Sequence, residues 1–130
     1  MVLNTTSQYA IRAMTLIANS DKESLYNAKE LSDTLNIPYK YLTKTMTKLV
    51  NANIIDSIRG REGGFALAKS PSEIKLIDIL DALKDCVDEK NCLLGTGMCD
   101  AREKCILHDQ WEHPRKEILN MFKNTTLENL

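Results

Sequence analysis

The segment formed by residues 38–67 constrains the fold more than any other part of this chain. A helical pattern opens at Pro38, which suits a first helical position, and Asn53 can take the left-handed conformation that closes it. A strand pattern over residues 54–59 follows, then a Gly-rich loop over residues 60–64 and a second strand pattern over residues 65–67. The order predicts a helix that leads directly into a two-stranded hairpin.

Two further helical patterns precede this segment. The first has Thr5 or Thr6 as its expected N-cap and repeats apolar residues at helical spacing until about Ser20. The second is short and has a capping-box pair in Asn27 and Glu30. Helix, short helix, tight turn, helix and hairpin is the order of a winged helix-turn-helix. We therefore expect a mainly α fold with a small β-hairpin, built around a winged helix-turn-helix.

The second half of the chain has a different organisation. A strongly apolar helix is expected around residues 76–83, followed by a cysteine-rich loop over residues 86–105. A last helix should then carry Ile106, Leu107, Trp111, Ile118, Leu119 and Phe122. Pro114 should kink or split that helix. Within one compact unit, we expect a winged helix-turn-helix region (1–85), a cysteine-rich loop (86–105), and a last helix with the C-terminal tail (106–130).

Basic side chains gather where the winged motif lies. The net charge of the chain is −1, yet residues 36–69 hold six Lys and Arg against two acidic residues. Hydroxyl-bearing residues repeat at four-residue intervals along the third helix, with a row of lysines beside them. Such a helix can enter the major groove of DNA, and an Arg-bearing hairpin tip can enter the minor groove. The expected DNA contacts are Tyr39, Lys40, Tyr41, Thr43, Lys44, Thr47, Arg59, Arg61, Gly63 and Gly64.

The four cysteines all fall in one short stretch. Cys92, Cys99, Cys105 and His108 have the spacing C-x6-C-x5-C-x2-H, and Cys86 is a further thiol. Thiolates gathered in one Gly-containing loop are typical of a soft-metal or iron-sulfur site. Structural zinc is an alternative, although only Cys105 and His108 have the close spacing of a zinc knuckle. Disulfides fit a reducing cytoplasm poorly, except as a redox switch.

With these motifs in view, the chain resembles the IscR and NsrR family of bacterial winged-helix regulators over essentially its whole length. The shared features lie in the first helix, the third helix, the hairpin, the cysteine loop with the tryptophan after it, and the C-terminal tail. The residues that carry the resemblance are Thr5, Tyr9, Ala10, Ala13, Met14, Tyr41, Leu42, Leu49, Arg59, Gly60, Gly63, Gly64, Phe65, Leu67, Trp111, Thr126, Leu127 and Leu130.

The resemblance implies a homodimer whose C-terminal helices pair and whose bound cluster controls which DNA sites are occupied. The chain is most similar to the IscR branch, and this implies a 2Fe-2S cluster on Cys92, Cys99, Cys105 and His108. The NsrR branch can use an acidic residue of the first helix as a ligand, but this chain has Gln8 there, and a neutral amide is a poor cluster ligand. A 4Fe-4S cluster and Cys86 as the fourth ligand stay open, because six residues separate Cys92 from Cys99 where the IscR pattern has five.

Other classes of protein fit the sequence less well. The first residues lack a secretion signal and no apolar run reaches the length of a membrane span, so we expect a cytoplasmic protein without membrane contact. We expect no catalytic activity and no small-molecule substrate, because no cofactor fingerprint or acid-base pair accompanies the cysteine loop. The open alternatives are a small electron carrier that uses the same cluster, and a cluster-free regulator that senses thiol oxidation or contains zinc.

Overall fold

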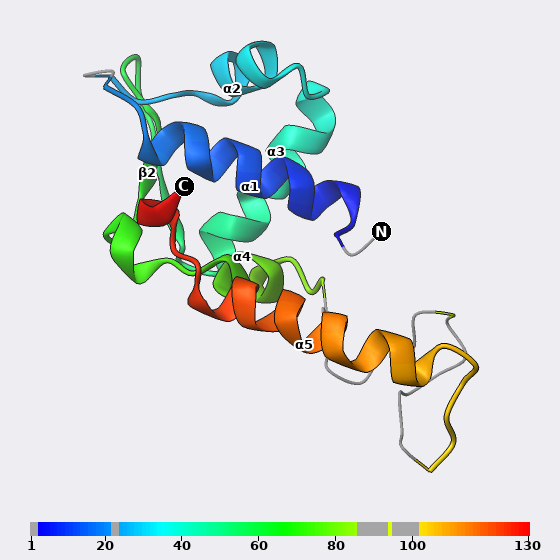
Figure 1. Ribbon diagram of the computed structural model, residues 1–130. Coiled ribbons are helices and arrows are strands. Elements are labelled where there is room, and N and C mark those ends of the chain that lie inside the picture. Colours follow the sequence, from blue (N-terminus) through cyan, green and yellow to red (C-terminus); the bar gives the residue numbers. More distant parts are fainter. Residues whose placement is uncertain (1–2, 22–23, 86–93, 95–101) are drawn as a thin grey trace.

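The computed structural model describes residues 3–21, 24–85, 94 and 102–130 (Figure 1). The helices are α1 (Thr5–Ala18), α2 (Ala28–Leu35), α3 (Tyr39–Asn51), α4 (Leu76–Ala82) and α5 (His108–Asn124). Strands β1 (Ile55–Ile58) and β2 (Gly64–Leu67) form an antiparallel hairpin, and two short 3-10 helices are η1 (Pro71–Glu73) and η2 (Leu127–Asn129). The mainly α fold with one small hairpin is therefore confirmed.

Asparagine residues set most of the helix boundaries in the first half of the chain. The Asn27 side chain accepts from the backbone N–H of Glu30 at the start of α2, as the capping pair predicted. Asn36 and Asn53 take left-handed conformations after α2 and α3. The expectation for α1 was wrong by one residue: Asn4 is the N-cap and its side chain accepts from Ser7 N, while Thr5 already lies within the helix.

The core forms around α1, which crosses the middle of the molecule in Figure 1. Its residues Ala10, Ala13 and Met14 are fully buried, and α2, α3, α4 and β2 pack around it. The C-terminal tail returns to this core after α5. Leu127 is buried there, and its backbone N–H donates to Ile74 O. The tail thus joins the end of α5 to residues 3–21 and 24–85, which we call the winged unit.

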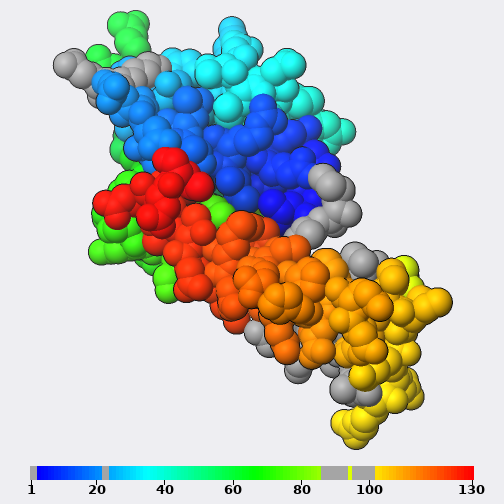
Figure 2. Space-filling model, viewed as in Figure 1, coloured from blue at the N-terminus to red at the C-terminus, as the bar shows by residue number. Residues whose placement is uncertain are grey.

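Helix α5 differs from expectation at two points. Pro114 lies inside a helix that runs without interruption from His108 to Asn124, so the predicted split is wrong. Ile106 and Leu107 were expected on this helix, but both precede its first residue, and Ile106 is 86% exposed. Figure 2 shows the residues that begin α5, in yellow and orange, extending away from the rounded body. Among the described residues, no helix is both long and apolar enough to cross a membrane.

Candidate DNA-binding face and cluster site

Helix α3 has one buried face and one exposed face. Leu42, Met46 and Leu49 are fully buried, and α3 packs on α1 and α2. Because these residues recur every three or four positions, the residues between them turn outward. Of the expected DNA contacts on α3, Thr43 is half-buried and the others are exposed, namely Tyr39, Lys40, Tyr41, Lys44 and Thr47. We call these six residues the α3 face.

The two threonine hydroxyls of the α3 face are engaged with the helix backbone. Thr43 Oγ1 donates to Lys40 O at 3.1 Å, and Thr47 Oγ1 donates to Thr43 O at 2.8 Å. A hydroxyl that donates within its own helix keeps only its lone pairs for an outside partner. These side chains are suited to accept from base amino groups or to place methyl groups against thymine. Donation to phosphates is left to Lys40, Lys44 and the two tyrosines.

Two of the hairpin glycines are required by the close approach of backbone atoms. A Cβ at Gly63 would lie 2.1 Å from Ile58 O, and one at Gly64 would lie 2.4 Å from Tyr26 O. Tyr26 passes this close because its carbonyl accepts from Phe65 N at 2.9 Å, which adds an isolated bridge beside β2. Gly63 and Gly64 therefore shape the hairpin, independently of the DNA contact expected for them.

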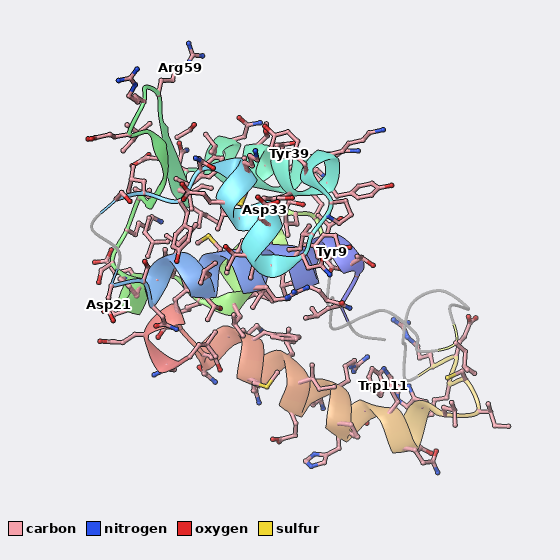
Figure 3. The ribbon with its side chains drawn as sticks, turned by 90° about the horizontal axis from the view of Figure 1, so that it is seen from above. Tyr9, Asp21, Asp33, Tyr39, Arg59 and Trp111 are labelled. Carbon is pink, nitrogen blue, oxygen red and sulfur yellow. The ribbon has the colours of Figure 1, made fainter. Side chains whose placement is uncertain are left out.

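The arginines of the hairpin tip face solvent. Arg59 follows β1 directly, Arg61 lies in the turn, and both are exposed. In Figure 3 the Arg59 side chain extends beyond the end of the hairpin, and Tyr39 lies on the same side of the molecule. Trp111 on α5 lies on the opposite side. The α3 face and the hairpin tip therefore form one candidate DNA-binding surface, with the start of α5 remote from it.

Two of the expected cluster ligands lie at the start of α5. Cys105 is a half-buried free thiol, and His108, the first residue of α5, is 4% exposed. The backbone N–H of His108 donates to Cys105 O at 3.1 Å, which closes the turn between them. Cys92, Cys99 and the alternative ligand Cys86 lie outside the described residues. The described residues by themselves bring no three metal-binding side chains together.

A carboxylate follows His108 by one helical turn. The distance between His108 Nε2 and Glu112 Oε2 is 3.9 Å, and Lys116 Nζ lies 3.1 Å from Glu112 Oε1. The hydrogen bond and the charge of Lys116 hold the pKa of Glu112 below its ordinary value of 4.5, and the charges of His108 and Arg115 act in the same direction. Partial desolvation opposes this shift in pKa. Glu112 therefore stays an anion beside the expected histidine ligand.

The inward side of α5 also holds polar nitrogens. Arg115 is 9% exposed, and its Nε and Nη1 are buried without a hydrogen-bond partner. The buried Nε1 of Trp111 likewise has no partner.

The sequence alone predicted no role for Glu112 or Arg115. The four-residue spacing of His108, Glu112 and Lys116 could have revealed the first, whereas burial of a charged helix residue leaves no sequence signal.

Comparison with known families identifies relatives along the whole chain. The Rrf2 family, described as an iron-dependent transcriptional regulator, matches residues 3–130. An HTH-type transcriptional regulator of Aquifex aeolicus is 33% identical over 132 residues, which cover 100% of this chain and 91% of that protein. The HTH-type transcriptional regulator IscR of Klebsiella pneumoniae is 28% identical over 130 residues, covering 100% of this chain and 79% of that protein.

Solved structures share the fold. CymR, the global cysteine regulator of B. subtilis, superposes with a TM-score of 0.80 and 26% identity over 98% of this chain and 93% of that one. IscR of T. potens superposes with a TM-score of 0.72 and 24% identity, over 98% of this chain and 83% of that one. These matches confirm the winged-helix architecture expected from the sequence.

Proposed function

This chain belongs to the Rrf2 family of transcriptional regulators, and on that basis we propose that it binds promoter DNA as a homodimer. It is a transcriptional regulator and not an enzyme. In this proposal the α3 face enters the major groove, and Arg59 and Arg61 meet the minor groove or its phosphates. The two exposed rows of α3 and the projecting hairpin support this division of contacts.

The second part of the proposal is an iron-sulfur cluster of the 2Fe-2S type held by Cys92, Cys99, Cys105 and His108. A 4Fe-4S cluster, or Cys86 in place of His108, is the alternative. Thiolate and imidazole donors suit such a centre, and when bound it supplies a redox-active group that oxidants can alter or remove. Cys105 and His108 fit it, because one turn joins a free thiol to an imidazole.

The burial of His108 is the observation that carries the cluster proposal. A histidine in the first turn of a surface helix is ordinarily exposed, whereas His108 is 4% exposed and follows a proposed thiolate ligand by three residues. Glu112 lies beside its Nε2 atom, the kind of carboxylate neighbour that orients ligating histidines in metal proteins.

The proposed signal passes between the two ends of the molecule through the dimer. Helix α5 would pair with α5 of a second copy, which brings each cluster loop near the partner's winged unit. The exposed apolar side chain of Met121 on α5 is consistent with such a contact. Occupancy and redox state of the cluster would then set promoter occupancy, with repression in the cluster-bound form.

The cluster is tested by purifying the full chain without oxygen and measuring iron, acid-labile sulfide and visible absorption. We expect iron and sulfide in equal amounts and a visible chromophore that Cys92→Ala, Cys99→Ala or Cys105→Ala abolishes. His108→Ala should shift the spectrum, with Cys86→Ala as the matched control. A shift in Cys86→Ala alone would move the fourth ligand to Cys86. Stoichiometric zinc without sulfide would contradict the proposal.

A second candidate is a cluster-free regulator that responds to oxidation of its cysteines. Cys105 is a half-buried free thiol, so an oxidant can reach it when no cluster is bound. This candidate predicts DNA affinity that responds to peroxide in protein containing no iron or sulfide. The cluster proposal predicts no such response in the cluster-free protein.

A further inference from the structure

The inward side of α5 holds a group of donors without acceptors. Arg115 is more than nine-tenths buried, and its Nε and Nη1 atoms have no hydrogen-bond partner. Trp111 precedes it by one helical turn, and its buried Nε1 also lacks a partner. Residues four positions apart lie on the same side of a helix, so the Trp111 and Arg115 side chains leave α5 on the same side. Figure 3 places Trp111 in the early turns of α5.

The nearby carboxylate does not satisfy these donors. Glu112 Oε1 is engaged by Lys116 at 3.1 Å, and its Oε2 lies toward His108. Its charge acts on Arg115 across space, but no hydrogen bond joins Glu112 to either buried nitrogen of Arg115. A buried guanidinium in which two nitrogens lack acceptors costs more free energy than an ordinary unpaired polar group.

We propose that Trp111 and Arg115 form an anion-binding site that takes a carboxylate or phosphate group. All the unpaired atoms are donors, one side chain carries a full positive charge, and arginine is the residue best matched to these oxygen acids. A single water would satisfy part of the donor set and none of the charge. This inference goes beyond the proposed function, because it needs neither the cluster nor DNA.

The acceptor can come from two sources with the same chemistry. One is a free small anion, and the other is a carboxylate of a second copy of the chain. The first source predicts that occupancy follows the concentration of added anion. The second predicts that occupancy follows the concentration of the protein and appears without any added anion.

Trp111 makes the site directly observable, because it is the only tryptophan of the chain. In a ¹⁵N-labelled full-length protein its indole N–H gives one resonance, followed while sodium acetate or sodium phosphate is added at ionic strength held constant with chloride. We expect a saturable shift with at least one of these anions, or a shift on raising the protein concentration. The Arg115 Nε–H resonance should move with it.

Three variants distinguish this site from general charge attraction. Arg115→Met should weaken anion binding about tenfold or more, and Arg115→Lys should weaken it less, because charge is kept and the planar donor group is lost. Lys116→Met removes an exposed cation from the next position and should leave binding within about twofold. Anion should also raise the melting temperature of the wild type and not of Arg115→Met.

The proposal is overturned by either of two results. One is an indole resonance that moves with neither anion and is indifferent to protein concentration, since a trapped water would then satisfy the donors. The other is a shift of equal size and midpoint in the wild type and in Arg115→Met, because the anion would then bind elsewhere.

Discussion

The winged unit and the start of α5 satisfy their polar groups in different ways. In the winged unit the helix ends are closed locally, by the Asn27 side chain and by the left-handed residues Asn36 and Asn53. On α5, by contrast, three buried nitrogens of Trp111 and Arg115 have no partner. Among the described residues outside α5, Ser7 Oγ is the only other buried side-chain nitrogen or oxygen without a hydrogen-bond partner.

This difference separates helix ends that are capped within one chain from buried nitrogens for which we propose an acceptor from outside the chain. Buried donors in native proteins are nearly always satisfied, so unpaired ones mark a place for a ligand, a cofactor or another chain. The winged unit can be formed and positioned by its own sequence.

The largest contrast is expected between two apolar substitutions. Leu42→Ala opens a cavity under the α3 face, where Leu42 is fully buried, and should lower the free energy of unfolding by about 2–5 kcal/mol. Ile106→Ala, at a residue 86% exposed, should change it by less than about 0.5 kcal/mol. Urea unfolding of both variants measures this. A comparable loss in Ile106→Ala would show that the start of α5 is packed more completely than described.

The hairpin provides the next largest effect. Gly63→Ala places a Cβ where Ile58 O lies 2.1 Å away, so the turn must rearrange. We expect promoter affinity to fall about tenfold, with a cost in stability of about 1–3 kcal/mol. Ser57→Ala, at an exposed residue of β1, is the matched control and should leave both unchanged. Full DNA affinity in Gly63→Ala, measured by fluorescence anisotropy, would remove the hairpin from the interface.

A single lysine on the α3 face tests the electrostatic part of the comparison. Lys44→Ala should weaken binding uniformly across DNA sequences and reduce the slope of log affinity against log salt by about one unit per protomer. Lys75→Ala, an exposed lysine before α4 and outside the candidate DNA-binding surface, should leave the slope unchanged. Equal slopes in wild type and Lys44→Ala would exclude a phosphate contact there.

The smallest effect concerns Glu112. Its pKa is lowered in the folded protein, chiefly by Lys116, so its ionised form is stabilised by folding. That stabilisation is present above the ordinary value of 4.5 and is lost as pH falls through the lowered pKa. Glu112→Gln should thus lower the melting temperature slightly near neutral pH and have no effect once the pH is below that lowered pKa. A difference that persists in acid would rule out the charge as its cause.

The sequence predicted the fold well because local signals agreed with one another. Asn36 and Asn53 mark two turns, and Leu42, Met46 and Leu49 recur at helical spacing. Pro114 misled the prediction, since a proline removes one backbone donor and α5 nevertheless continues through it. Helix α1 began one residue away from the expected cap because Asn4 competes with two threonines for that role.

The candidate site was less predictable, for two physical reasons. The exposed rows of α3 follow directly from its buried face, so the α3 face could be read from spacing alone. The burial of His108 and Arg115 depends on contacts made across the fold, which helical periodicity does not encode. The spacing of the cysteines predicted thiol ligands, but Cys105 is the one that the described residues include.

The central claim, that the state of the cluster controls DNA binding, is tested most directly by one titration. Protein purified without oxygen is divided, the cluster is removed from one half, and both halves are titrated against the same promoter fragment at fixed salt. The account predicts that affinity for the promoter differs at least about tenfold between the two forms, a coupling of about 1.4 kcal/mol. Equal affinity of the two forms would contradict it.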